Sequence, residues 1–471
     1  MPASLHDPTK WPASKRWPAT IIVVFMTASI GFCASIHAPI IADVARTFGC
    51  SRTVATLGLT TYLLGFAFGG LLLAPLSEVW GRNAVYRSTL LLFVVFNAGC
   101  ALAPDITSLL VFRFLSGVFG SSSVSTSGGS VSDMWPQSHR SVPLALYTAA
   151  CFLGPVMAPI VGGFISQYCS WRWGYWIVTI HSGISYVVML FFLPETYTPY
   201  LNSKATKSNS SFDAGVLARP ILMLATEPIL FLLCLYMAIV NAILYLNFTA
   251  YPIIFKETRG WSPGLAGLAF LGIGFGMAIA TACSPLLNRL HTTYTRKHGS
   301  TPEARLPPLV PLVYLLPASL LLFACTARPP AHWALPIAAG LPFGLAFVPL
   351  VAACTAYLVD CYGRYAASAI AAAAFLRNVA GALFPLFASD LYNDLGTASA
   401  SVMLAAAALV LAPLPWVFWL WGEGLRERSR FHRAAVEEGE GAWLLGEEGV
   451  VVVDGVGADG EEQGCSGYGA A

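Results

Sequence analysis

Long apolar runs recur along the whole chain, and no other feature of the sequence restricts the fold as strongly. The first, Ala19 to Ile41, contains no Asp, Glu, Lys or Arg. Roughly 20 helical residues cross the hydrocarbon core of a bilayer, so this run can span it, and it is too long for a secretory signal. Because lipid offers no partner for open backbone groups, each such run must be a helix. We therefore expect an all-α polytopic membrane protein that retains its first span.

The apolar runs form two groups of equal size, separated by a polar stretch from Glu195 to Glu227. About twelve transmembrane helices in two six-helix bundles are therefore expected. The expected spans are 19–41, 57–76, 86–104, 107–130, 142–167, 172–194, 228–252, 263–288, 307–326, 331–358, 365–389 and 398–421. The expected regions are a cytoplasmic tail (1–18), a first bundle (19–194), a central cytoplasmic loop (195–227), a second bundle (228–421) and a disordered acidic cytoplasmic tail (422–471).

Composition excludes several classes of protein. Only 11% of the residues are charged and 56% are hydrophobic, whereas a soluble globular domain usually carries about 25% charged residues. A net charge of +2 gives no basis for binding nucleic acid. The cysteines have no CxxC or Cys/His spacing, and no GxxxxGK(S/T) loop is present, so we expect no metal, cofactor or nucleotide.

Basic residues outside the spans predict the orientation in the membrane. If the amino terminus is inside the cell, most of the 26 Lys and Arg residues lie on the cytoplasmic side. Those that would lie outside are Arg46, Arg52, Arg172, Lys256, Arg259 and Arg328. Because positive residues collect on the cytoplasmic side, we expect a plasma-membrane protein with both termini and the central loop in the cytoplasm.

The loop after the second span reads LAPLSEVWGRNAVYR, from Leu73 to Arg87. Gly81 permits a tight turn between two helices that nearly touch. Glu78 and Arg82 place opposite charges at the cytoplasmic edge. Ordinary loop charges that snorkel to the interface would give the same pattern if this motif stood alone.

Arg113, in the sequence FRFLSGVFG, lies a turn or two into the fourth span and is followed by small residues from Ser121 to Ser130. A guanidinium at membrane depth costs at least about 2.5 to 3.5 kcal/mol, so Arg113 should face a wet cavity or a partner and serve a function. The alternative is an arginine close enough to the interface to snorkel.

The fifth span carries the most specific pattern, GPVMAPIVGG, from Gly154 to Gly163. Pro155 and Pro159 remove backbone hydrogen bonds and kink the helix, while the small residues let a neighbouring helix approach closely. Such a helix can act as a pivot or a seal, although glycine and proline are common in membrane helices generally.

Together, these three patterns resemble the signature motifs of the major facilitator superfamily, and the third resembles the antiporter motif of its twelve-span drug:proton antiporter branch. Further fragments are similar to fungal multidrug and polyamine exporters of that branch: WRWGYW from Trp171, LPETY from Leu193 and YLVDCYGRYAASA from Tyr357. The resemblance covers residues 20–425 and leaves both tails outside it.

The resemblance also implies roles for single residues. Arg113 would belong to the proton-coupling or substrate site. An ionic latch that steadies the outward-facing state would consist of Glu78, Gly81, Arg82, Asp133 and Arg140. The flexing helix between the halves would use Gly154, Pro155, Pro159, Gly162 and Gly163, with Ala158 where the motif often has glycine.

Polar residues in other spans complete the predicted site. Arg377 and Asn378 in the eleventh span are candidates for the cavity or gate, the alternative being a pairing of Arg377 with a carbonyl or with Asp360. No Asp or Glu lies deep in the first six spans, which leaves His181 and His37 as titratable candidates there. A lone membrane histidine is more often packed and neutral, so a proton role for His181 competes with a structural one.

The seventh span carries aromatic and amide side chains that suit a cavity for bulky amphipathic molecules. Helical periodicity predicts that about half of them face the cavity. They are Tyr236, Asn241, Tyr245, Asn247 and Tyr251. Similar proteins often have a glutamate where Thr249 stands, so its absence favours neutral or weakly charged, hydrophobic cargo over cations such as polyamines.

We therefore expect a monomeric secondary transporter that exports small hydrophobic molecules across the lipid bilayer in exchange for protons, by exposing one site alternately to each side. Uptake of a nutrient, or polyamine transport, on the same fold is a second hypothesis. An integral membrane enzyme would need a cluster such as HExxH or a nucleophilic serine with partners, and the sequence has none. A receptor fits twelve spans in equal halves poorly.

Epitope tags before Met1 and after Ala471 should both be protected from protease in intact cells, because the positive-inside bias places both ends in the cytoplasm. Both tags should become accessible when the membrane is permeabilised. A tag inserted beside Arg328, in a predicted outer loop, is the control and should be accessible in intact cells. Termini on opposite sides would contradict an even number of spans.

Overall fold

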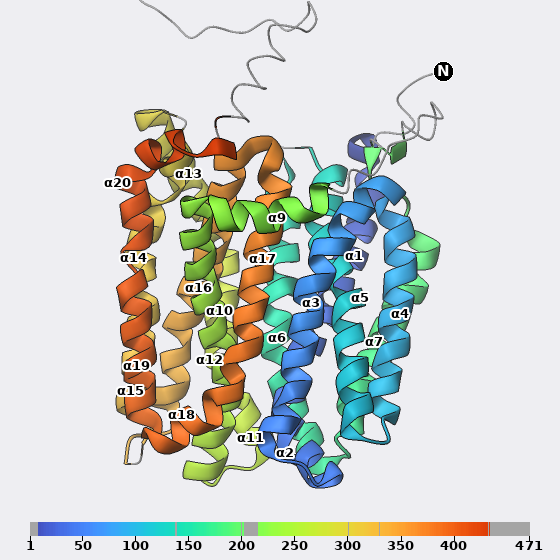
Figure 1. The fold of residues 1–471 in the computed structure, drawn as a ribbon, viewed down its shortest axis with the longest axis vertical. Coiled ribbons are helices and arrows are strands. Elements are labelled where there is room, and N and C mark those ends of the chain that lie inside the picture. The colour runs from blue at the N-terminus through green and yellow to red at the C-terminus, as the bar shows by residue number, and fades with distance from the viewer. Residues whose placement is uncertain are drawn as a thin grey trace, which may run out of the picture.

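A computed structural model describes residues 8–136, 139–198, 200–201, 215–299, 301–328, 330–431 and 433. Twelve helical segments in this part of the chain are long and apolar enough to cross a membrane, which confirms the predicted all-α fold. The segments run side by side, with the first half on the right of Figure 1 and the second half on the left. Residues 202–214 of the predicted central loop and the tail after residue 433 lie outside the described residues.

Each of the six spans of the first half is built on one long helix. These helices are α1 (Ala13–Ser35), α3 (Arg52–Trp80), α4 (Arg82–Leu102), α5 (Ile106–Met134), α6 (Ser141–Tyr168) and α7 (Arg172–Phe192). Polar side chains mark two of the starts. Ser51 accepts a hydrogen bond from the Val54 N–H before α3, and Asp105 accepts one from the Ser108 N–H before α5, so both begin at an N-cap.

Several spans of the second half consist of two shorter helices joined end to end. The second half contains α10 (Pro228–Pro252), α11 (Pro263–Leu268) with α12 (Leu271–Ala282), α14 (Val310–Val313) with α15 (Leu315–Thr326), α16 (Ala334–Tyr362), α17 (Ala366–Leu383) with α18 (Ala388–Asp394), and α19 (Gly396–Leu411) with α20 (Leu414–Glu427). The breaks follow from local sequence, since prolines lie at or next to several of them.

Many spans begin or end a few residues from their predicted limits, and in two spans the difference arises where a helix breaks. The first was predicted at 19–41, but α1 begins at Ala13, breaks at Ile36 and is followed by α2 (His37–Phe48). Pro39 has no N–H to donate to the carbonyl four residues earlier, which explains the break. The eighth span ends at Ala282, because α13 (Ser284–His298) is a separate helix with a proline in its first turn.

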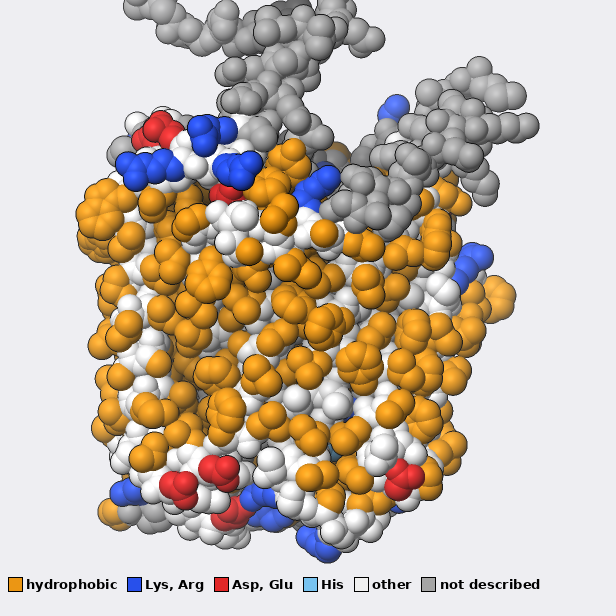
Figure 2. Space-filling model, in the orientation of Figure 1, with side chains coloured by type: hydrophobic (Ala, Val, Ile, Leu, Met, Phe, Trp, Pro, Cys, Tyr) orange, Lys and Arg blue, Asp and Glu red, His pale blue; other side chains and the backbone are white. Residues whose placement is uncertain are grey.

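The flank of the molecule is covered by hydrophobic side chains, whereas charged side chains gather at its two ends (Figure 2). Some large apolar side chains on the flank are as exposed as Phe191 and Val410, both at 77%. In water a surface of this kind would drive aggregation, whereas lipid tails solvate it. The apolar surface therefore supports a multi-pass membrane protein, as the lengths of the helices do.

The end of the predicted central loop is not a plain polar linker. Residues Gly215–Thr226 form α9, which lies across α10, α17 and α3 at one end of the molecule (Figure 1). Pro220 and Met223 are buried, while Ile221 and Leu222 are exposed. The sequence analysis missed this helix because its apolar run is too short to span a membrane.

The second bundle also extends beyond its predicted end at residue 421. Helix α20 continues to Glu427, and Arg426 Nε lies 3.1 Å from Glu303 Oε1. The buried carboxylate of Glu227 accepts hydrogen bonds from the backbone N–H groups of Arg430 and Phe431, at 3.1 and 3.2 Å. These contacts order the chain past the span, so an irregular tail cannot begin before these residues.

The glycine- and proline-rich helix α6 contacts both halves of the molecule. Gly154 lies against the backbone of α1, and Gly162 against the ring of Pro39, while Ala158 is fully buried. A Cβ atom added to Gly163 would lie 2.5 Å from the Pro263 carbonyl oxygen. One added to Gly267 would lie 2.7 Å from the Pro159 carbonyl oxygen. The small residues of the motif therefore let α6 and α11 touch backbone to backbone.

Polar contacts reinforce this closure between the halves. Arg52 Nη1 lies 2.8 Å from Glu257 Oε1. The Thr60 hydroxyl donates to the Ala382 carbonyl at 2.8 Å, and the Gly264 N–H donates to the Gln167 side-chain oxygen at 3.1 Å. Helices α2 and α11 lie at the end of the molecule opposite α9 (Figure 1). The halves are thus closed against each other at that end, and we call this contact the α6–α11 seal.

Replacing Gly163 with valine should weaken the α6–α11 seal, because overpacking a close contact costs about 1–3 kcal/mol. Ala42 lines a small pocket that Gly163 and Gly267 also border, so the reporter is a cysteine introduced there as Ala42→Cys. With Cys50, Cys169, Cys283 and Cys325 replaced by serine, this cysteine should react with a membrane-impermeant thiol reagent about tenfold faster in the Gly163→Val protein.

The matched control is Gly183→Val, because a Cβ atom at Gly183 would meet nothing within 4 Å. Its labelling rate should equal that of the protein with an unchanged Gly183. An unaltered rate in Gly163→Val, at normal expression, would show that this glycine does not hold the seal.

Candidate functional site

A cavity of about 360 Å³ lies between the two halves. Helices α1, α3, α5 and α6 line it from the first half, and α10, α16 and α17 from the second. Cavities that bind small molecules have volumes of about 300–1,000 Å³. Most of the lining is apolar, and the side chains with oxygen or nitrogen atoms are Thr27, Tyr147, Thr148, Asn241, Tyr245, Thr355, Arg377 and Asn378.

A second cavity of about 230 Å³ continues this space towards one end of the molecule. The two cavities share Leu144, Thr148 and Ala352. The second also reaches His291 on α13 and Arg305, near the end where α9 crosses the bundle. Burial, and then the positive charge of Arg305, lower the pKa of His291, so its imidazole is uncharged at pH 7. The cavity is thus accessible from the α9 end and closed at the α6–α11 seal.

The structure places both predicted residues of the eleventh span at the cavity. Arg377 and Asn378 line it, and the Asn241 amide donates to the Arg377 carbonyl oxygen at 3.0 Å. Asp360 instead forms an ion pair with Arg305. The alternative in which Asp360 pairs with Arg377 therefore does not occur.

The polar residues of the seventh span divide between the cavity and the helix packing. Asn241 and Tyr245 line the cavity, whereas Tyr236 and Asn247 are buried elsewhere. The Thr249 hydroxyl donates to the Leu246 carbonyl of its own helix at 2.8 Å. Tyr251 stacks on Phe270 and Phe323. The structure thus places two of these residues, Asn241 and Tyr245, at the cavity and the others in the helix packing.

Arg113 is completely buried, with 0% of its surface exposed, so it does not snorkel. Its Nε donates to the Gly58 carbonyl at 2.8 Å and its Nη1 to the Cys33 carbonyl at 3.1 Å. The guanidinium also lies 4.4 Å from the ring centre of Tyr62. Arg113 is not among the residues that line the cavity. It instead ties α5 to α1 and α3 behind the cavity wall.

Of the two histidine candidates, His37 is the one that lies beside Arg113. The Tyr175 hydroxyl is 2.5 Å from His37 Nδ1, and His37 Nε2 is 2.7 Å from the Ala55 carbonyl oxygen. A neutral imidazole that donates from Nε2 satisfies both contacts. The guanidinium of Arg113 lies 5.7 Å from the Tyr175 ring centre, so the three side chains form one buried cluster.

His181 occupies a different place. It is hydrogen-bonded to Ser29 where α7 packs on α1, and its ring centre is 3.9 Å from that of Phe25. It is absent from the lining of the cavity. Its proton role stays a prediction, and the geometry matches the packed-histidine alternative.

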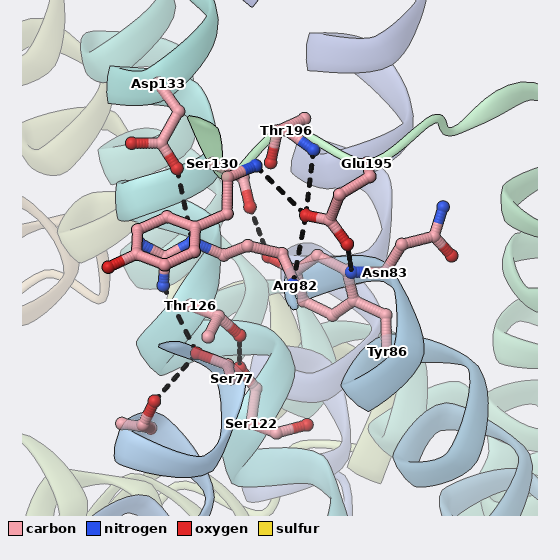
Figure 3. A network of polar contacts seen from close by, with 12 residues as sticks. Ser77, Arg82, Asn83, Tyr86, Ser122, Thr126, Ser130, Asp133, Glu195 and Thr196 are labelled. Atoms are coloured by element: carbon pink, nitrogen blue, oxygen red, sulfur yellow. Dashed lines mark hydrogen bonds and ion pairs between the residues drawn. The ribbon is translucent and has the colours of Figure 1, made fainter. Parts of the chain in front are cut away.

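Residues of the predicted latch meet around Arg82, at the start of α4 (Figure 3). Arg82 Nε lies 3.2 Å from Asp133 Oδ2, and Arg82 Nη1 donates to the Ser77 hydroxyl at 3.2 Å. Arg140 Nε donates to the Trp135 carbonyl at 3.2 Å. The side chain of Glu78 lies outside the described residues. The structure thus brings Arg82 and Asp133 together, as the motif implied.

Two glycines make room for these charges. Gly81 has a positive φ of 87°, which favours glycine, and a Cβ atom there would lie 2.7 Å from Glu195 Oε2. A Cβ atom at Gly129, in the run of small residues, would lie 2.5 Å from Arg82 Nη2. The first glycine was recognised from the turn, whereas nothing in the sequence pointed to the second.

Glu195 is the main residue of this network that the sequence analysis missed. Its Oε1 accepts hydrogen bonds from the backbone N–H groups of Arg82, Thr196 and Tyr197, at 3.1, 2.9 and 3.0 Å. Its Oε2 accepts one from the Asn83 N–H at 3.0 Å. A carboxylate that accepts the free N–H groups at the start of a helix is stabilised by the helix dipole. Glu195, which follows the last helix of the first half in the sequence, therefore caps the start of α4 (Figure 3).

Glu195→Gln should lower the melting temperature more than Glu257→Gln. Hydrogen bonds to a charged group contribute about 1.5–3 kcal/mol each, and glutamine cannot accept at both former carboxylate oxygens. Glu257 is the matched control, because its ion pair with Arg52 is exposed, and exposed pairs contribute about 0–1 kcal/mol. Intrinsic tryptophan fluorescence of the detergent-purified proteins measures both transitions. Equal shifts would contradict the assigned cap.

The fold is shared with solved transporter structures. The human organic anion transporter MFSD10 (TETRAN) has a TM-score of 0.59 at 17% identity, covering 86% of this chain and 100% of that one. The proton:xylose symporter XylE has a TM-score of 0.62 at 16% identity, covering 87% and 97%. At these identities the likeness concerns the fold alone.

Sequence comparison gives closer relatives. The "MFS-type efflux pump MFS2" of Trichophyton rubrum is 37% identical over 92% of this chain and 76% of its own length. The "Major facilitator superfamily multidrug transporter mdrA" of Aspergillus fumigatus is 38% identical over 90% and 74%. The family model described as Major Facilitator Superfamily matches residues 23–385. The chain therefore belongs to the major facilitator superfamily of membrane transporters.

Proposed function

We propose that this protein exports small hydrophobic molecules from the cytoplasm in exchange for protons. The observation that carries the proposal is the largely apolar cavity between the halves, which is accessible from the α9 end and closed at the α6–α11 seal. The relatives whose names describe an efflux pump and a multidrug transporter support export as the direction. We also propose a monomer in the plasma membrane, with the α9 end and both termini in the cytoplasm.

Export by alternating access needs two coordinated changes. The α6–α11 seal opens, and the passage between α6, α13 and α16 closes. Because the backbones meet at Gly163 and Gly267 without intervening side chains, the seal can part by a rocking of α6 over α11. The pair formed by Arg82 and Asp133 lies within the first half. We therefore propose that the latch keeps this half rigid while it rocks.

The cluster of Arg113, His37 and Tyr175 is the proposed coupling site. Arg113 holds the carbonyls of Cys33 and Gly58, on the two helices α1 and α3 that lie on either side of it. A proton on His37 would add a second positive charge next to this guanidinium and would remove the acceptor used by Tyr175. Protonation and the position of α1 are thereby linked. None of the three residues lines the cavity, so the cluster would act on the cavity by moving helices and not by touching the cargo.

Uptake of a nutrient on the same fold is the second candidate, and flux direction separates the two. In inside-out vesicles with an acidified lumen, uncharged and anionic fluorescent lipophiles should accumulate in the lumen if the protein exports them. Arg113→Ala should reduce the initial rate at least about tenfold, a change of roughly 1.4 kcal/mol in barrier, because α1 and α3 lose their shared partner.

Arg46→Ala is the matched control, since the Arg46 side chain is 77% exposed and pairs with Asp43 within one helix. It should leave the rate unchanged. Movement of the same compounds out of the acidic lumen would favour uptake instead. An unchanged rate for Arg113→Ala at normal protein level would remove Arg113 from the mechanism.

A further inference from the structure

The cavity between the halves carries a positive charge and no described acid to balance it. Arg377 is an arginine, which stays protonated at any pH a protein meets. None of the described residues that line the cavity is Asp, Glu or His. The cavity that leads to the α9 end contains Arg305 and His291 and likewise has no acid in its described lining. The whole described route is therefore electropositive or neutral.

The guanidinium of Arg377 is also unpaired within the described residues. Only its backbone takes part in a hydrogen bond there, as acceptor for Asn241, and the carboxylate of Asp360 is used by Arg305. The groups that act on it electrostatically are phenols and thiols, those of Cys151, Tyr147, Tyr245 and Cys234. These groups are neutral at pH 7. An uncompensated arginine within a membrane span is costly, so it is expected to serve a function.

Arg113 provides the internal comparison. It is also an arginine without a carboxylate, but carbonyl oxygens and aromatic faces surround it and it is fully buried. Arg377 has no such carbonyl partners among the described residues and borders an open space of about 360 Å³. The guanidinium of Arg113 is closed off from the cavity, although its Nη2 has no hydrogen-bond partner among the described residues. The guanidinium of Arg377 borders the cavity and is therefore the one available to a ligand.

Resting on the export function proposed above, we propose that the cargo is an amphipathic organic acid whose carboxylate, or a similar oxyanion, pairs with Arg377. A guanidinium presents two parallel N–H donors that match the two oxygens of a carboxylate, and the pair gains strength away from water. The apolar body of such a molecule would lie against Phe66, Phe152 and Ile30, which line the same cavity. Asn378 lies next to Arg377. Its amide nitrogen donates to the Ala374 carbonyl at 2.7 Å, which leaves its side-chain oxygen to accept from a donor on the cargo.

Three probes of nearly equal size test the charge preference: naphthylacetate, its methyl ester, and naphthylmethyl-trimethylammonium. Calorimetric titration of the purified full-length protein at pH 7 should show naphthylacetate binding at least about tenfold more tightly than the ester. The cation should bind more weakly than the ester. Equal binding of acid and ester, or preference for the cation, would overturn the proposal.

Variants of cavity residues test whether the preference for the acid depends on the charge of Arg377 or on the shape of the cavity. Arg377→Gln should abolish the preference for the acid while leaving the affinity for the ester within about twofold. Arg377→Lys should retain part of the preference, because the charge remains. The control Thr148→Val, at another lining residue, should keep the full preference. A preference that survives in Arg377→Gln would assign the anion to another site and overturn the proposal.

Flux measurements with the same probes distinguish a failure of the anion site from a failure of the proposed export function. Vesicles that move the ester or the cation but not naphthylacetate would leave export in place and overturn the anion site. Vesicles that move none of the probes, while naphthylacetate still binds with its preference intact, would overturn export and leave the site in place. If none of the probes binds to a protein that still exports other lipophiles, the anion site is excluded.

Discussion

Hydrocarbon offers no hydrogen-bond partner, and this single constraint governs how the helices are built and how they meet. Many hydroxyl groups inside the bundle return to their own helix, as when Thr27 donates to the Val23 carbonyl at 2.9 Å. Where polar groups are used locally in this way, close backbone approach joins the helices. Such approaches occur at Gly65 and Gly117, where α3 and α5 meet, and at Gly344, where α16 meets α12.

The same constraint distinguishes the charged groups of the interior. Some charged side chains are held by partners from several helices at once, as are Arg82 and Arg113. Glu227 is used in the same way, since its carboxylate accepts from the backbone after α20. Arg377 stands apart because its neighbours leave its guanidinium free to face the cavity. Burial among helix neighbours, as opposed to a place on the cavity wall, therefore separates structural charges from available ones.

Much of the architecture could be predicted from the sequence, because apolar length and helical geometry are local properties. The number of twelve spans was predicted correctly, and the structure places Gly81 at a turn and Arg377 at the cavity. The features that were not predicted depend on contacts between segments that are distant in the sequence. Glu195 is more than a hundred residues from the helix that it caps, and α9 is recognisable only by the helices that it crosses. The choice between His37 and His181 likewise depended on which helix faces lay together.

The cap on α4 has a mechanical consequence. Glu195 sits at the start of the covalent connection between the two halves, directly after α7, and α9 at the other end of that connection rests on helices of both halves. A rotation of one half therefore pulls on a carboxylate that holds the first turn of α4 and the guanidinium beside it. The cap on α4 is thus the point at which a movement between the halves would reach the first bundle.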